Sequence, residues 1–257
     1  MALEIKNLTI GEGMPKICVP ITGTTEDEIL EQADMILESP FDLVEWRVDF
    51  YEDVFKTAKT LEVLKSLREK FADAPLLFTF RTENEGGKYI STSDYLNLLM
   101  AVCESQLVDL VDVEIFMAEA AVKTIIEIAH THNVKVIASN HDFKKTPDIL
   151  TILSRLDKMD NMNADILKIA AMPTSKEDVI NLLSATVKAK QLIEDKPIVT
   201  MSMGHLGLIT RLCGEFSGSA ITFGFVGEES APGQIDAAQL KSYLLGLTLD
   251  SSESIVD

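Results

Sequence analysis

Short apolar runs alternate with amphipathic segments along almost the whole chain, and this alternation is the feature that most restricts the fold. The runs are rich in Val, Ile and Phe and are mostly bounded by turn or capping residues, as expected of buried strands. We predict eight strands, at residues 16–21, 43–50, 76–81, 108–116, 135–140, 166–172, 198–203 and 220–226. The segments between them place apolar residues at helical spacing. These predict helices at residues 24–37, 57–71, 91–105, 118–130, 146–159, 175–193, 206–212 and 235–245.

Eight strands that alternate with eight helices in one α/β chain are typical of a (β/α)₈ TIM barrel. An open, doubly wound sheet is the alternative, but no Gly-x-Gly-x-x-Gly motif follows the first strand. No linker rich in Pro, Gly or Ser divides the chain, so we expect one domain over residues 1–257. Residues 1–14 precede the first barrel strand, and within them we expect residues 3–10 to form a β-hairpin that covers one barrel end.

The charge balance excludes several kinds of partner. The 257 residues include 23 Lys plus Arg and 41 Asp plus Glu, giving a formal net charge of −18. Nucleic acids and anionic membrane surfaces both require clustered cations, so neither is expected as a partner. No apolar run reaches the roughly 18 residues of a membrane span, and no signal peptide is visible. Three distant cysteines suggest neither a disulfide framework nor a metal site. We expect a soluble, cytoplasmic protein.

Charged residues occur inside the predicted strands, where a purely structural barrel would have branched aliphatic residues. Glu45, Arg47 and Asp49 alternate with apolar residues, so they share one face of their strand. The apolar face must pack on helices, and the charged face therefore points into the barrel. A structural interpretation stays open for each residue alone, because Arg47 could simply pair with Glu45 or Glu114. Further polar residues lie in or at the ends of four other strands: Thr79, Arg81, Asp112, Glu114, Ser139, Asn140, His141 and Lys168.

Lys168 is the most informative of these residues, because it is a single lysine in an otherwise apolar run. Charges gathered at the carboxyl ends of barrel strands are typical of an active site. A neutral amine can attack a carbonyl and form a Schiff base. His141 ends the neighbouring strand and suits general acid–base chemistry near neutral pH, although a satisfied structural histidine is the alternative.

Loops after the late strands complete the expected site. Met201 and Met203 suit an apolar lining, and Arg211 follows them closely. The segment 227–234, after the last strand, is expected to act as a binding loop or lid. The glycine-rich stretch 214–218 precedes that strand, so it would lie at the wrong barrel end for a phosphate site.

Seven short motifs in this order resemble the type I 3-dehydroquinate dehydratase (3-dehydroquinase) family of the shikimate pathway. They are EWRVD (45–49), FTFR (78–81), EGG (85–87), SNHDF (139–143), KIA (168–170), MSMG (201–204) and SAPGQ (230–234). The resemblance runs from about residue 14 to residue 245. It implies a lyase that dehydrates 3-dehydroquinate to 3-dehydroshikimate, the third step on the way to chorismate and the aromatic amino acids. It also implies a homodimer that needs neither a metal nor an organic cofactor.

The resemblance assigns roles to individual residues. Lys168 matches the Schiff-base lysine, His141 the residue that removes the C2 proton and assists loss of the C1 hydroxyl, and Glu85 the acid that orients this histidine. Arg211 matches the ligand of the substrate carboxylate. The remaining expected substrate-binding residues are Glu45, Arg47, Arg81, Met201, Met203, Phe223, Ser230 and Gln234.

Two other functions remain open from the residues alone. A class I aldolase also places a Schiff-base lysine on a barrel strand, but Glu228 and Glu229 would repel a phosphorylated substrate from the last loop. A non-catalytic barrel that serves as a scaffold is hard to reconcile with an isolated lysine near a histidine. Borohydride treatment with substrate distinguishes a Schiff-base enzyme from a scaffold, because a scaffold gains no mass.

Overall fold

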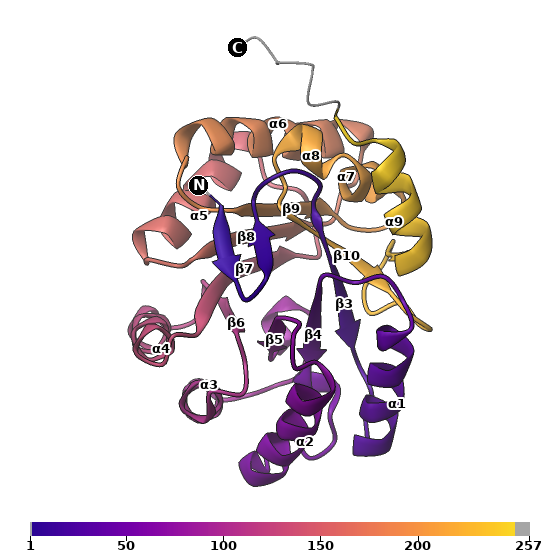
Figure 1. The fold of residues 1–257 in the computed structure, drawn as a ribbon. Helices are drawn as coiled ribbons and strands as arrows, with labels where there is room; N and C mark the ends of the chain where they lie inside the picture. The colour runs from indigo at the N-terminus through magenta and orange to yellow at the C-terminus, as the bar shows by residue number, and fades with distance from the viewer. Residues whose placement is uncertain (1, 250–257) are drawn as a thin grey trace.

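A closed parallel barrel forms the centre of the computed structural model, which describes residues 2–249 (Figure 1). From β3 to β9 each strand pairs with the next along the chain, β10 pairs with β3, and an isolated bridge between Ile198 and Ser219 joins β9 to the segment before β10. This is the predicted (β/α)₈ arrangement, which is thereby confirmed. The barrel strands are β3 (Lys16–Ile21), β4 (Leu43–Arg47), β5 (Leu76–Thr79), β6 (Leu110–Glu114), β7 (Lys135–Asp142), β8 (Ile166–Ala171), β9 (Ile198–Ser202) and β10 (Ile221–Phe225). A short strand, β11 (Ile235–Asp236), extends the sheet beyond β10. One domain was predicted over residues 1–257, and residue 1 and residues 250–257 of that range lie outside the described residues.

A serine side chain helps to close the ring between β9 and β10. The amide of Ala220 donates to the carbonyl of Ile198 at 2.8 Å. Beside it, Ser219 Oγ accepts from the Thr200 amide at 3.0 Å and donates to the Thr200 carbonyl at 3.1 Å. The hydroxyl therefore satisfies both backbone groups of Thr200, which would otherwise need a ladder partner.

The helices lie outside the barrel, and several begin at side-chain caps. Thr25 and Ser175 form capping boxes, while Ser91 and Asp148 accept from the first helical turn. These residues precede their helices instead of belonging to them, which explains why the helices start later than predicted. The helices are α1 (Glu26–Leu37), α2 (Thr57–Lys70), α3 (Thr92–Ser105), α4 (Glu119–Thr131), α5 (Ile149–Asn161), α6 (Lys176–Leu192), α7 (Leu208–Leu212), α8 (Gly214–Ser217) and α9 (Ala237–Gly246).

Three 3₁₀ turns modify the expected boundaries. They are η1 (Val48–Phe50), η2 (Glu83–Glu85) and η3 (His205–Gly207). The strand predicted at residues 43–50 stops at Arg47, where the chain tightens into η1. The first residues of the predicted final helix form β11, because Ile235 and Asp236 pair with the end of β10.

The N-terminal hairpin covers the amino-terminal end of the barrel, as predicted. Strands β1 (Leu3–Ile5) and β2 (Leu8–Ile10) pair antiparallel, and in Figure 1 they cross in front of the barrel. Ile5 and Ile10 are buried against the inward-facing residues nearest the amino ends of the barrel strands. That layer is entirely apolar: Cys18, Leu43, Leu77, Leu110, Ile137 and Ile166.

Above this apolar layer the inward-facing residues become polar. The next residue on the same face of each of five strands belongs to the set Glu45, Thr79, Asp112, Ser139 and Lys168, all of them buried. The outward-facing residues of the strands pack against the helices in a separate apolar cluster. Inside the barrel, the buried polar side chains therefore lie towards the carboxyl ends of the strands, which is where barrel enzymes bind substrates.

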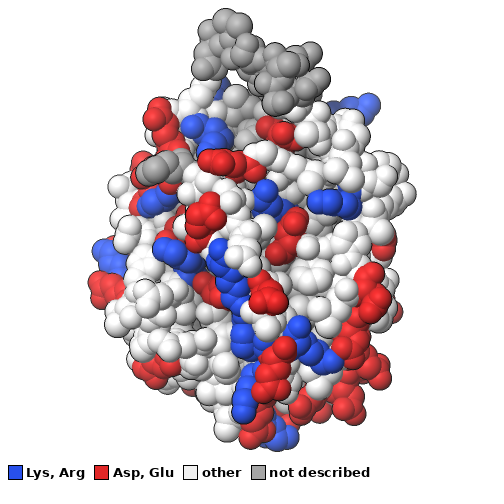
Figure 2. Space-filling model, viewed as in Figure 1, with Lys and Arg blue, Asp and Glu red and all other residues white. Residues whose placement is uncertain are grey.

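The face shown in Figure 2 mixes acidic and basic side chains without a continuous basic patch. Acidic groups gather at the lower right, over α1, where Glu26, Asp27 and Glu28 are exposed. Within residues 2–249, every helix is too short or too polar to cross a membrane.

Candidate active site

A cavity of about 220 Å³ opens at the carboxyl ends of the barrel strands. All twelve site residues predicted from the sequence line it, although they come from eight separate parts of the chain. They are Glu45, Arg47, Arg81, Glu85, His141, Lys168, Met201, Met203, Arg211, Phe223, Ser230 and Gln234. The cavity therefore gathers a nucleophilic amine, an imidazole, three guanidinium groups and an apolar wall around one small volume.

Lys168 reaches the cavity from the middle of β8. Its neighbours Leu167 and Ile169 face the helices, while Ala170 shares its inward face and leaves space beside the amine. The Nζ atom lies 3.4 Å from Asp112 Oδ2 and 4.4 Å from the centroid of the Phe223 ring. The side chain is only 4% exposed, so the amine is held in a dry environment by one carboxylate and one aromatic face.

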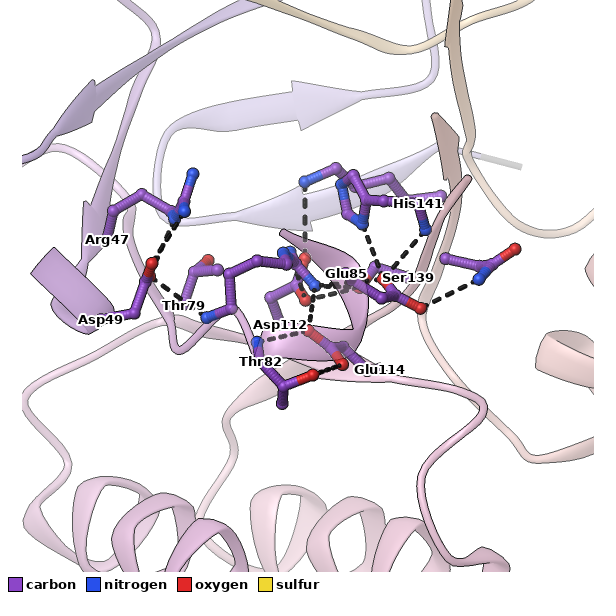
Figure 3. A network of polar contacts seen from close by, with 12 residues as sticks. Arg47, Asp49, Thr79, Thr82, Glu85, Asp112, Glu114, Ser139 and His141 are labelled. Atoms are coloured by element: carbon purple, nitrogen blue, oxygen red, sulfur yellow. Dashed lines mark hydrogen bonds and ion pairs between the residues drawn. The ribbon is translucent and has the colours of Figure 1, made fainter. Parts of the chain in front are cut away.

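His141 is oriented by Glu85, which comes from the η2 turn after β5 (Figure 3). Glu85 Oε2 accepts from His141 Nδ1 at 2.8 Å and from the His141 backbone amide at 2.9 Å. A carboxylate can only accept, so Nδ1 carries the proton and Nε2 is left unprotonated. Burial, followed by the charges of Arg81, Lys168 and Arg47, holds the pKa of His141 well below its usual value. The imidazole is therefore neutral and able to accept a proton.

The Glu85 carboxyl sits among competing charges. Burial raises its pKa to about 7, and Glu114 and Asp112 act in the same direction. Arg81 and a hydrogen bond from Asn140 oppose this shift. Glu85 and His141 thus form a pair whose protonation changes near neutral pH.

Arg81 is the centre of a buried ion network, part of which Figure 3 shows. Its guanidinium donates to Asp112 at 2.9 Å, to Glu114 at 3.1 Å and to Ser139 at 3.0 Å. Asp112 also accepts from the Ser139 hydroxyl at 2.6 Å. Burial disfavours the charged form of Asp112, but Arg81, Lys168 and Ser139 outweigh it, so the pKa of Asp112 is lowered. The network keeps an ionised carboxylate beside the Lys168 amine.

Arg47 pairs with Asp49, whereas the sequence had left Glu45 and Glu114 as its possible partners. The guanidinium donates twice to the Asp49 carboxylate, at 2.9 and 2.8 Å (Figure 3). The η1 turn brings Asp49 close to Arg47, which an extended strand through residue 50 would not do. Glu45 instead accepts from the Thr79 hydroxyl at 2.8 Å.

Arg211 differs from Arg47 and Arg81, because no carboxylate of residues 2–249 forms an ion pair with it. Within this range its guanidinium donates only to the carbonyls of Phe223 and Pro232, at 3.4 and 3.3 Å, with the Met201 sulfur at 3.9 Å. Its Nε atom is buried without a hydrogen-bond partner in that part of the chain. Burial lowers the pKa of Arg211 to about 10, and the charge of Glu229, beyond ion-pair distance, opposes this shift. A buried cation that lines a cavity and has no direct ion pair among these residues is suited to bind an anionic ligand.

The predicted binding loop lies across the cavity. The Pro232 carbonyl accepts from the Gly204 amide at 3.0 Å as well as from Arg211. Gly233 has a φ of +75°, and a Cβ atom there would lie 2.5 Å from the Gly204 carbonyl oxygen. Ser230 and Gln234 hydrogen-bond to each other, which fixes the loop from within. This packing holds the loop against the end of β9.

Several lining or supporting residues were not predicted to have a role. Phe50, Phe143 and Pro232 complete the apolar part of the wall, and Phe143 stacks on His141 with the ring centroids 6.5 Å apart. Asp112 was recognised as a strand charge but not as the neighbour of Lys168. Asn140 was recognised as a polar residue at a strand end and as part of the SNHDF motif, but no role was predicted for it.

The described residues do not gather His, Cys, Asp or Glu side chains in threes or more at positions that could hold one metal ion. The groups at the cavity are suited to nucleophilic attack, proton transfer and binding of an anion.

Comparison with known proteins identifies the family. The model of type I 3-dehydroquinase matches residues 17–249. The 3-dehydroquinate dehydratase of Clostridium botulinum is 49% identical over 243 residues, which cover 94% of this chain and 96% of that protein. The enzyme of Salmonella typhimurium is 47% identical over 94% of this chain and 96% of its own length.

Solved structures agree with the sequence matches. A crystal structure of type I 3-dehydroquinate dehydratase from Clostridium difficile with covalently modified comenic acid superposes with a TM-score of 0.92 at 47% identity, covering 96% of this chain and 97% of that one. The Geobacillus kaustophilus 3-dehydroquinate dehydratase gives 0.93 at 36% identity, with 96% of each chain covered. The family model and these relatives all span the barrel and its cavity, and the chain therefore belongs to the type I 3-dehydroquinase family.

Proposed function

We propose that this chain dehydrates 3-dehydroquinate to 3-dehydroshikimate through a Schiff base on Lys168. The observation that carries the proposal is a buried amine that shares one cavity with a neutral histidine and an arginine that forms no ion pair within residues 2–249. The substrate has a ketone, a carboxylate and several hydroxyls, and each has a matching group at the cavity. The names of the relatives, 3-dehydroquinate dehydratases, support the same reaction.

The proposed covalent step uses Lys168 as the nucleophile. The amine attacks the C3 ketone, and the carbinolamine takes up a proton and loses water to give a protonated imine; the later hydrolysis returns this proton. The imine withdraws electrons from C2 and makes its proton acidic. His141 Nε2 accepts this proton, and the electron pair forms an enamine.

The same histidine then acts as the acid. The enamine expels the C1 hydroxyl, which takes the proton from His141 and leaves as water. Water hydrolyses the conjugated imine, releasing 3-dehydroshikimate and restoring the Lys168 amine. The sum is the loss of one water molecule, with no change in oxidation state.

The other cavity residues are proposed to bind the substrate. Arg211 would bind the carboxylate in place of its two carbonyl contacts, and Ser230 and Gln234 would close over the ring. Glu45, Arg47 and Arg81 supply polar groups for the ring hydroxyls. Methionine and phenylalanine side chains would exclude water on the remaining side.

Arg211→Ala is expected to weaken use of the substrate more than it slows chemistry. A buried guanidinium–carboxylate contact contributes about 2–4 kcal/mol, so kcat/KM should fall by about 30- to 700-fold, mainly through KM. Arg211→Lys is the matched control, because it keeps the positive charge but loses the planar guanidinium. Its kcat/KM should lie between those of Arg211→Ala and the wild type. Steady-state kinetics with 3-dehydroquinate measures the effect. Unchanged kinetics in Arg211→Ala would refute the carboxylate assignment.

The activity is expected to rise with pH through an acid limb near pH 7. Above that pH Glu85 is a carboxylate that accepts from His141 Nδ1, so Nε2 is free to take the C2 proton. Below it Glu85 binds a proton and this acceptor is lost, because burial has raised its pKa to about 7. The kcat/KM profile measures the limb, which belongs to the His141–Glu85 pair. Glu85→Gln should be slower and lack the limb, whereas the same limb in that variant would assign it to another group.

The function itself is tested by adding 3-dehydroquinate and following ultraviolet absorbance, because the product is conjugated and the substrate is not. We also propose that the protein works as a cytoplasmic homodimer in the third step of the shikimate pathway. Light scattering at several concentrations tests the oligomeric state, and a mass of one chain throughout would reject the dimer.

A further inference from the structure

Arg155, on α5 outside the barrel, connects to His141 through a chain of three hydrogen bonds, the last of which joins the candidate catalytic pair Glu85 and His141. Its Nη1 donates to Asn140 Oδ1 at 2.7 Å, and Asn140 Nδ2 donates to Glu85 Oε1 at 2.9 Å. Glu85 Oε2 accepts from His141 Nδ1 at 2.8 Å. Arg155 and Asn140 lie outside the lining of the cavity, so neither would touch the substrate.

We propose that Arg155 is a positioning residue for the proposed dehydration, because it holds the Asn140 amide in the orientation that donates to Glu85. This inference rests on the proposed function. An asparagine amide has two ends of nearly equal shape, and its partners decide which end points where. An arginine offers donors only and does not lose its proton, so Asn140 Oδ1 must face Arg155. The amide nitrogen then has to face Glu85.

The orientation matters because Glu85 is buried among charges of both signs. A reversed amide would place Oδ1 against the Glu85 carboxylate and remove one of its few donors. The charged or titratable groups around Glu85 and Arg155 come from the segment after β5 and from β6, β7 and α5: Arg81, Asp112, Glu114, His141, Asp142 and Lys158. Arg81, at 3.6 Å, favours the Glu85 carboxylate, while Asp112 and Glu114 oppose it. Without the amide donor, Glu85 would stay protonated up to a higher pH. Over that added pH range, His141 Nδ1 would lose the Glu85 carboxylate as its acceptor.

Arg155 is itself held in place, as a positioning residue must be. Its guanidinium lies 3.7 Å from Asp142 Oδ2 and 5.7 Å from the Phe116 ring centroid. Lys158, one helical turn further along α5, lies over the same ring at 4.8 Å. Lys158 therefore provides a matched control, because it is a cation on the same helix and over the same ring, whereas the donor to Asn140 Oδ1 is Arg155.

Two substitutions test the inference with the full-length protein. Arg155→Met removes the donor that fixes the amide. Asn140→Asp keeps a partner for Arg155 but offers no donor to Glu85. In Arg155→Met, kcat for 3-dehydroquinate should fall about tenfold, the effect of losing one hydrogen bond to a charged group, and the acid limb should move up by about one pH unit. In Asn140→Asp both effects should be at least as large, because the new carboxylate also repels that of Glu85. KM and the mass of the borohydride-trapped adduct should be unchanged, because the cavity is intact. Arg155→Lys should recover part of the rate, and Lys158→Met should behave as wild type.

The outcomes separate this inference from the proposed function. Wild-type kcat and pH profile in Arg155→Met and Asn140→Asp would overturn the inference alone. A slower enzyme with an unmoved acid limb, or an equal loss in Lys158→Met, would also overturn it, since general damage to α5 would explain the result. If Arg155→Met fails to fold, Asn140→Asp and Arg155→Lys decide the question by the same readouts. Absence of turnover in the wild-type protein would reject the proposed function, and this inference with it.

Discussion

Treatment with borohydride in the presence of 3-dehydroquinate should add one reduced ligand to the chain, attached at Lys168. The amine is buried at the cavity, with Ala170 leaving room beside it and Asp112 and Phe223 holding it in place. Lys168→Met should neither label nor turn over measurably, because no other group at the cavity can form an imine. Intact mass followed by peptide mapping locates the label, and absorbance measures turnover.

Lys168→Met should still fold, because loss of the Lys168 amine does not leave the Asp112 carboxylate without partners. Arg81 and Ser139 remain at 2.9 and 2.6 Å from Asp112. Lys168→Arg is the matched control for charge: it keeps a cation beside Asp112 but lacks a nucleophilic amine, so it should be equally inactive. A label on another lysine, or substantial turnover in either variant, would refute the Schiff-base mechanism.

His141→Ala should separate imine formation from proton transfer. Lys168 keeps its surroundings and can still attack the ketone, so a covalent adduct should accumulate on mixing with substrate. Turnover should fall by at least about 10²-fold, the contribution of a positioned general base. Mass spectrometry without borohydride measures the adduct, and steady-state absorbance measures the rate.

The Glu85 carboxylate keeps two of its donors in this variant, from the Asn140 amide and the backbone amide of residue 141. We therefore expect the surrounding network to survive the substitution. His132→Ala is a control for the loss of an imidazole, because His132 lies at the end of α4, away from the cavity. A rate close to that of wild type in His141→Ala would show that another group removes the C2 proton.

The sequence by itself determined the barrel and the identity of most cavity residues. Hydrophobic periodicity depends on neighbours a few residues apart, so it located the strands and the helices to within a few residues, and the residues left before the first barrel strand predicted the N-terminal hairpin. Strand alternation then placed Glu45, Thr79 and Lys168 on the inward face. The family motifs added Glu85 and Gln234, and the resemblance gave Arg211 its role, none of which local periodicity could place.

Only the tertiary structure decided which of these groups contact one another. Asp112 is 56 residues from Lys168 in sequence, and Asn140 is 55 residues from Glu85. Arg47 pairs with Asp49 because a 3₁₀ turn replaces the last residues of a strand that periodicity had predicted to continue. Barrel closure places the carboxyl ends of distant strands around one axis, and no local pattern encodes the resulting distances. For this reason the charges were predictable from sequence, whereas their partners became visible only in the folded chain. The same holds for the Arg211 guanidinium, which forms no ion pair within the described residues, and for the link from Arg155 to His141.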